Sequence, residues 1–401
     1  MAFLDPLTAL TLSFILLAAM LYKRVSIGIA LVSSAIIMSL LSMDPTDIIE
    51  VFITTTIDPL TISLVAVTMG IMLLSLLYRE TQTLDSLSIS FGNLLKNPKI
   101  IVSVLPAIIG LLPVPGGALM SAPLVEKNAE SLGFKEDKKT YVNVWFRHII
   151  FPIYPMSQVL ILAAALTGAS ITSIIIAQIP VVVAMTIVGY FTVLKNATPT
   201  NETNQDTKLQ ESLKVFFISF SPILTMILTV VIFNVNVSIA AFAGIGLLLL
   251  ITRPRRQVLI KTISNTATYK IALAAYGAML LRSATMTSGV SNAIAQTIVA
   301  YNVSEFLLLA TIPAALAFLV GSPSGGIAIS FPILAGFLSF TPSSASLLFI
   351  SAYLGYLAAP THLCLALTAD YFKCPLNKMY KLLIPSLVIS FAVALLVYYI
   401  L

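Results

Sequence analysis

Two short segments of the chain place glycine, serine and proline in the same order. Residues 113–123 are Pro-Val-Pro-Gly-Gly-Ala-Leu-Met-Ser-Ala-Pro, and residues 322–332 are Ser-Pro-Ser-Gly-Gly-Ile-Ala-Ile-Ser-Phe-Pro. A Gly-Gly pair permits close backbone approach, and a helix that starts there offers free N–H groups and the positive end of its dipole. Such helix starts bind anions, and the carbonyls that end a preceding helix suit Na⁺. The two segments therefore predict a site for a small anion and a coupling cation.

The residues expected to bind at these two tips share a turn position or a hydroxyl group. They are Pro115, Gly116, Gly117 and Ser121 in the first segment, and Ser322, Ser324, Gly325, Gly326 and Ser330 in the second. The plainer alternative is that Gly-Gly only permits a tight turn and serine only caps a helix.

Prolines interrupt two long apolar stretches downstream of the tips. Proline removes a backbone donor, and unwound backbone within a membrane is tolerated only where it lines protein or water. The residues expected to bind substrate or ion at these breaks are His148, Pro152, Tyr154, Pro360, Thr361 and His362. A kink that serves packing is the alternative. Arg147 is interpreted mainly as a side chain that reaches out of the membrane from the end of its span.

Few residues offer other chemistry. The chain has two histidines and two cysteines, not at the spacing of metal ligands, and no nucleotide-binding motif. Asp370 is the only carboxylate near a break. We therefore expect no enzyme activity, no cofactor and no resident metal, beyond transported Na⁺ at the same tips.

The composition predicts the elements that position these residues. Of 401 residues 58% are hydrophobic and 9% are charged, against about 25% charged in ordinary soluble proteins. This composition predicts an all-α polytopic membrane protein. Ten crossings are expected, at 4–22, 25–42, 59–78, 141–165, 171–194, 214–234, 235–252, 270–288, 344–370 and 380–401. The stretches 100–125 and 304–340, which contain the two tips, are expected to be re-entrant hairpins.

The basic residues predict the orientation. With both termini outside, every Lys and Arg except Arg147 and Arg282 falls on the cytoplasmic side, as the positive-inside rule requires. The formal net charge of +6 then orients the chain and is no sign of nucleic-acid binding. The location expected is the inner membrane of a prokaryotic cell.

The chain divides into two similar halves around one polar segment. Residues 1–195 form the first repeat, 196–211 a cytoplasmic linker and 212–401 the second repeat. Each half has five crossings, an odd number, so the second half is inverted relative to the first. Inverted repeats with broken helices are typical of secondary transporters.

The segments 113–123, 147–155 and 325–332 resemble those of domain-of-unknown-function family 401, a prokaryotic membrane family placed in the ion transporter superfamily with divalent anion/sodium symporters and citrate, gluconate and arsenite permeases. The resemblance covers essentially the whole chain. It implies a homodimer and an elevator mechanism with scaffold and transport domains. Dicarboxylate symporters carry Ser-Asn-Thr at each tip, and this chain does not, which weakens the case for dicarboxylates.

The expected function is an ion-coupled secondary transporter of a small organic anion, with Na⁺ favoured over H⁺ as the coupling ion. The alternative is a Na⁺/H⁺ antiporter on the same fold, for which His148, His362 and Asp370 are the titratable candidates. A membrane enzyme and a passive channel are weaker alternatives. The expected partners are the anion, Na⁺ or H⁺, the lipid bilayer and a second copy of the chain.

Overall fold

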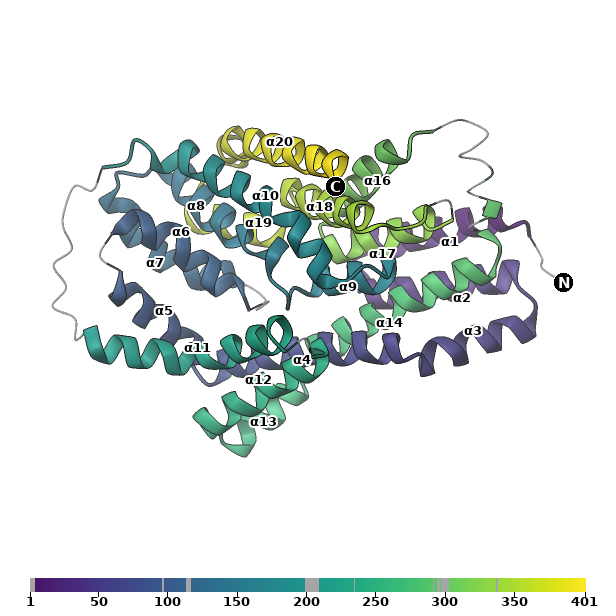
Figure 1. Cartoon of the computed structure of the whole chain (residues 1–401), viewed down its shortest axis with the longest axis horizontal. Helices are drawn as coiled ribbons and strands as arrows, with labels where there is room; N and C mark the ends of the chain where they lie inside the picture. The colour runs from purple at the N-terminus through teal and green to yellow at the C-terminus, as the bar shows by residue number, and fades with distance from the viewer. Residues whose placement is uncertain are drawn as a thin grey trace. The chain divides into compact units, whose positions relative to one another are not determined.

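The computed structural model describes residues 4–95, 97–112, 117–198, 209–233, 235–290, 292–293, 296, 303–336 and 338–401. Within these ranges every regular element is a helix (Figure 1). Pro115, Gly116 and most of the predicted linker lie outside the described residues.

Six stretches of the described chain are long and apolar enough to cross a membrane. They are Pro59–Glu80, Glu136–Thr167, Ile171–Leu194, Leu209–Val231, Pro342–Tyr371 and Leu376–Ile400. The chain thus has the helices of a multi-pass membrane protein, as the composition predicts. The other predicted crossings coincide with α1 (Pro6–Tyr22), α2 (Ile27–Ser42), α12 (Val237–Thr252) and α14 (Thr266–Thr287), which are not among the six. The total of ten crossings stays a prediction.

The chain forms two compact units, which are described separately. Unit 1 comprises residues 1–69, 158–174 and 265–356, and unit 2 comprises 70–157, 175–264 and 357–401. Each unit therefore takes segments from both sides of the polar stretch 196–211.

Unit 1 is built on α2 and α14, which pack along each other (Figure 1). Helix α1 packs on α2, and α3 (Pro45–Ile57) packs on α14. Helices α16 (Glu305–Val320) and α17 (Pro323–Leu334) form a close pair, and α17 also contacts α9 (Gln158–Thr167) and α14. The first part of α4 (Pro59–Glu80) and most of α18 (Pro342–Ala358) complete the unit.

Unit 2 surrounds α8 (Glu136–Ile149), in which every residue from Thr140 to Ile149 is buried. A helix that is covered all round belongs to a core. Its neighbours are α6 (Pro98–Gly110), α7 (Gly117–Ser131), α19 (Leu363–Tyr371) and α20 (Leu376–Ile400). The chain's single tryptophan, Trp145, lies on α8, and its indole nitrogen donates to the carbonyl of Met185, 3.0 Å away in α10 (Ile171–Gly189).

Further helices outside this core complete unit 2. Helix α5 (Thr83–Leu94) packs on α6 and on α11 (Leu209–Val231), and α11 packs on α12. Helix α13 (Arg256–Ile263) follows α12, and a π-helical turn at Tyr190–Leu194 ends α10.

Both long apolar stretches with prolines are interrupted where the sequence predicts. Helix α8 ends at Ile149, a single 3₁₀ turn covers Phe151–Ile153, and α9 begins at Gln158. Helix α18 ends at Ala358, and α19 begins at Leu363. Proline at 152, 155 and 360 removes the donors that would continue these helices. The chain passes from one unit to the other at the first interruption, between Ser157 and Gln158, and close to the second, between Tyr356 and Leu357.

Candidate functional site

The tip between α16 and α17 lies in unit 1 and is shaped by local backbone rules. Gly321 ends α16 with φ of +67°, a conformation that glycine adopts without strain. Ser322 then caps α17, because its Oγ accepts the N–H of Gly325 at 3.2 Å. A Cβ on Gly326 would lie 2.5 Å from the Cβ and 2.8 Å from the backbone nitrogen of Ala317. The second glycine is therefore needed for the close approach of the two helices.

A hollow of about 80 Å³ opens beside this tip within unit 1. Its polar lining is Ser322, Ser324, Gly325, Thr68 and Gln158, and the other lining residues are apolar. The amide of Gln158 donates to the carbonyl of Thr68 at 3.3 Å. Since a water occupies about 30 Å³ of liquid, this hollow has room for an ion with water or for one carboxylate group. An anion of several carbons would need the hollow to widen.

Ser330, the remaining predicted residue of this tip, is not in the lining of the hollow. It is buried, and its hydroxyl donates to the carbonyl of Ile327 in its own helix at 3.2 Å. The hydroxyl of Ser121 lies at the same distance, 3.2 Å, from the carbonyl of Ala118 in α7.

The other tip belongs to unit 2 and includes a buried arginine. Gly117 is the first residue of α7, and its carbonyl accepts a hydrogen bond from Nη1 of Arg147 at 3.3 Å. Arg147 is only 2% exposed. The interpretation of Arg147 as a side chain that reaches out of the membrane is therefore wrong. The hydrogen bond to the Gly117 carbonyl holds the guanidinium of Arg147 inside the unit.

A buried polar network lies one turn further along α7. Ser121 donates to the side-chain oxygen of Asn143 at 2.6 Å. The amide nitrogen of Asn143 donates to the carbonyl of Ala118 at 2.9 Å and to the hydroxyl of Thr368 at 3.1 Å. The network links α7, α8 and α19 and satisfies groups that burial would otherwise leave unpaired.

The two proline breaks bring both histidines together in unit 2. His148 and His362 are 3% and 0% exposed, and their ring centroids are 4.8 Å apart with an edge-to-face angle of 84°. Nδ1 of His148 lies 2.6 Å from the carbonyl of Val144. Pro152 and Tyr154 are buried, whereas Pro360 and Thr361 are exposed.

Three further charged residues are Arg282 and Asp58 in unit 1 and Asp370 in unit 2. Arg282 places its guanidinium 5.8 Å from the ring centroid of Phe331 within unit 1. Burial raises the pKa of Asp58, but hydrogen bonds from Thr61 and Leu60 and the charge of Arg282 hold it below its usual value. The side chain of Asp370 is 83% exposed and pairs with Lys373, which suits a surface carboxylate better than a buried proton relay.

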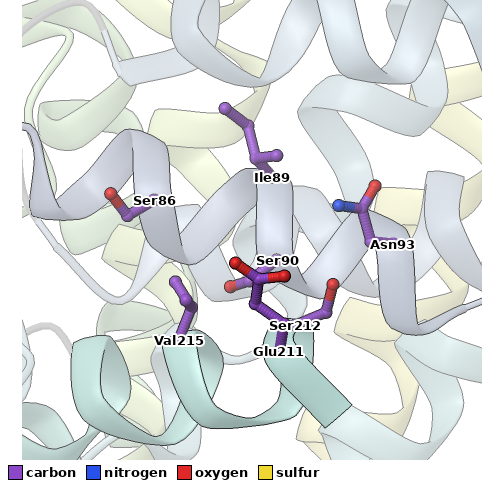
Figure 2. Close-up of a pocket in the computed structure, with 7 residues that line it drawn as sticks. All are labelled: Ser86, Ile89, Ser90, Asn93, Glu211, Ser212 and Val215. Carbon is purple, nitrogen blue, oxygen red and sulfur yellow. The ribbon is translucent and has the colours of Figure 1, made fainter. Parts of the chain in front are cut away.

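A larger hollow of about 440 Å³ lies between α5 and α11 in unit 2 (Figure 2). The sequence did not single it out. Figure 2 shows its lining side chains, which are Ser86, Ile89, Ser90, Asn93, Glu211, Ser212 and Val215. The carboxylate of Glu211 disfavours an anion there. The hydroxyl and amide groups suit a polar neutral or cationic molecule.

Sequence reasoning missed the polar residues that complete each cluster. Asn143 and Thr368 were not singled out, and neither was Thr68. An asparagine within an apolar span was the one available signal, because a buried amide needs partners.

Comparison with known proteins identifies a family. A search of curated proteins finds no match for the chain. The model of one family, described as "Protein of unknown function (DUF401)", matches residues 7–401, nearly the whole chain. The protein therefore belongs to the DUF401 family.

Proposed function

We propose that the protein is a secondary active transporter of a small organic anion, coupled to Na⁺ and built on the ion transporter superfamily fold. The observation that carries the proposal is the hollow at the start of α17. Ser322, Ser324 and Gly325 line it with hydroxyl groups and a helix start, and the amide side chain of Gln158 also lines it. These groups stabilise a carboxylate or coordinate a cation without a fixed charge of their own.

The start of α7 adds independent support from unit 2. The carbonyl of its first residue, Gly117, accepts a hydrogen bond from the buried side chain of Arg147. A guanidinium held inside a membrane protein is costly unless it is paired, and it is typical of substrate pathways.

The proposal includes the finer features that the sequence predicts, which are two inverted repeats, cytoplasmic placement of residues 196–211 and the inner membrane of a prokaryote. It also includes the elevator movement and the homodimer that the family resemblance implies. The matching tip segments and the proline breaks support the repeats and the elevator movement.

Uptake into liposomes tests the proposal. Purified protein in sealed vesicles receives an inward Na⁺ gradient and a panel of labelled mono-, di- and tricarboxylates. We expect uptake of at least one anion, lost when the Na⁺ gradient is collapsed. Gln158→Ala and Ser324→Ala should reduce uptake, and Ser90→Ala in the α5–α11 hollow should not. A panel in which no anion is transported and none raises the melting temperature would exclude the anion transporter.

A Na⁺/H⁺ antiporter on the same fold is the second candidate, favoured by the contact of His148 with His362. Imidazole is the side chain whose ordinary pKa lies close to neutral pH, so histidines are the usual proton carriers of such exchangers. Vesicles with a pH-sensitive dye and no organic solute test it. Proton flux driven by Na⁺, and lost in His362→Gln, would favour the antiporter, whereas silent vesicles that still take up a carboxylate would exclude it.

A further inference from the structure

One cluster in unit 2 has the composition of a metal site, although the sequence spacing does not suggest one. A ring nitrogen of His148, a ring nitrogen of His362 and the Sγ of Cys364 all lie within 4.8 Å of one another. The three residues come from the end of α8 and the start of α19, which are distant in sequence. We propose that His148, His362 and Cys364 bind a thiophilic d¹⁰ metal ion, Zn²⁺ or Cu⁺.

The ring geometry agrees with a shared ion. With metal–nitrogen bonds of about 2.0–2.1 Å, two imidazoles on one tetrahedral ion have ring centroids roughly 5 Å apart. The centroids of His148 and His362 are 4.8 Å apart. Ligand atoms around such an ion are roughly 3.3–3.6 Å apart, so side-chain rotations that move these atoms by about 1 Å complete the site.

The tautomer of His148, with its proton on Nδ1, also suits a metal ligand. A carbonyl oxygen only accepts hydrogen bonds, so Nδ1 of His148 donates to Val144 across 2.6 Å. The lone pair is then on Nε2. Metal-binding histidines almost always donate their other ring N–H to a carbonyl or carboxylate, which fixes the ring and raises its basicity.

The donor set selects the class of ion. Two imidazoles and one thiolate suit Zn²⁺ and Cu⁺ and do not suit Mg²⁺, Ca²⁺ or Na⁺, which prefer oxygen. As the sulfur–metal bond forms, the S–H bond of Cys364 breaks and its proton passes to the buffer, and no electron is transferred. The thiolate then offsets part of the ion's charge beside Arg147, whose guanidinium is directed to the Gly117 carbonyl. The site does not depend on the transport proposal.

The chain offers a matched control, because its other cysteine is Cys374, between α19 and α20. Purified full-length protein is dialysed against Zn²⁺, or against Cu⁺ without oxygen, and the metal content is measured. We expect one Zn²⁺ or one Cu⁺ to bind per chain in at least one of the two dialyses. The ion that binds more tightly identifies the occupant of the site. Cys364→Ser should weaken binding by about 100-fold or more, because even outer partners of a site cost about 10–100-fold. Cys374→Ser should bind as the wild type does.

Co²⁺ gives a spectroscopic readout on the same proteins. A thiolate-to-cobalt charge-transfer band should be present in the wild type and in Cys374→Ser and absent in Cys364→Ser. Failure of both Zn²⁺ and Cu⁺ to bind stoichiometrically, or binding that Cys364→Ser leaves unchanged, would overturn the site.

A measurement on the wild type alone covers the case in which Cys364→Ser does not fold. The bound ion should slow alkylation of Cys364 and leave the rate at Cys374 unchanged, as measured by mass spectrometry of the two peptides. Equal rates at Cys364 with and without the ion would overturn the proposal.

Discussion

Nη1 of Arg147, near the end of α8, lies 3.3 Å from the carbonyl oxygen of Gly117, the first residue of α7. The arginine thus holds the start of the helix on which the first tip depends. The contact leaves no room for a larger residue, because a Cβ on Gly117 would lie 2.5 Å from Nη2 of Arg147.

Gly117→Ala should therefore displace the guanidinium. Loss of a hydrogen bond to a charged group costs about 1.5–3 kcal/mol, so we expect the free energy of unfolding to fall by that amount. Denaturant unfolding of the purified protein measures it. Gly92→Ala in α5 is the control, since nothing lies within 4 Å of a Cβ there and alanine favours a helix by about 0.5–1 kcal/mol. A Gly117→Ala protein as stable as wild type would contradict the contact.

Asn143→Leu should destabilise the network that joins α7, α8 and α19. The change leaves the carbonyl of Ala118 and the hydroxyls of Ser121 and Thr368 without this partner, at a cost of about 1–3 kcal/mol. In a double-mutant cycle with Ser121→Ala the two effects should couple by at least about 0.5 kcal/mol. Ser103→Ala, whose hydroxyl bonds only within its own helix, should show no coupling to Asn143→Leu. Additive effects of Ser121→Ala and Asn143→Leu would argue against the network.

Ser322→Ala should weaken the start of α17. Its Oγ accepts the N–H of Gly325, and loss of such a cap costs about 0.5–2 kcal/mol. Ser304 precedes α16 in the equivalent position but makes no capping bond, so Ser304→Ala should change stability by less than about 0.5 kcal/mol. Melting curves of the two variants decide this prediction, and equal effects would count against a capping role.

Asp58 should make stability depend on pH in the acid range. Its pKa in the folded protein is below the ordinary value of 3.8, with burial opposed by hydrogen bonds from Thr61 and Leu60. A lowered folded pKa stabilises the protein above the ordinary value, and the gain is lost as the pH falls through the folded pKa. The melting temperature of wild type should exceed that of Asp58→Asn most above about pH 4, and the difference should shrink in stronger acid. A difference independent of pH would contradict the prediction.

Ser324→Cys tests alternating access. The glycines of the two tips are poor sites for a cysteine, because Gly117 and Gly326 have no space for a Cβ, whereas Ser324 is half-buried and lines the hollow. In vesicles of either orientation, a membrane-impermeant thiol reagent should label Ser324→Cys from one side without Na⁺ and from the other side with it. Ser304→Cys at the exposed start of α16 is the control, and the reagent should label it from the same side with and without Na⁺. Labelling of Ser324→Cys from a single side under all conditions would count against an elevator movement at this tip.

The sequence predicted the elements well because their causes are local. Apolar runs specify the helices, and Pro152 and Pro360 stop them because proline lacks the N–H that a helix needs. Gly117 begins α7 as expected. The expected start of the second helix after Gly326 is wrong, because Ser322 caps α17 and Pro323 begins it, so both glycines lie in its first turn. The predicted inverted repeats and the ten crossings stay predictions.

The side-chain contacts within each cluster were less predictable, because they join residues that are far apart in the sequence. Asn143 meets Thr368 across 225 residues, and no spacing rule covers such a pair. Arg147 lies near the end of a span, where a long charged side chain is expected to extend out of the membrane. The carbonyl of Gly117, 30 residues away in sequence, instead holds its side chain inside. His148 and His362 likewise show no metal-ligand spacing and meet only in the fold.

Trp145 gives the protein an intrinsic optical reporter. It is the only tryptophan of the chain, it is fully buried on α8 and it lies between Asn143 and Arg147. Excitation selective for tryptophan therefore yields the emission of one fluorophore, with no second source to subtract. The emission wavelength and intensity of Trp145 report on the surroundings of a single helix turn. A bound ion or a displaced arginine there changes the fluorescence, and no added label is needed.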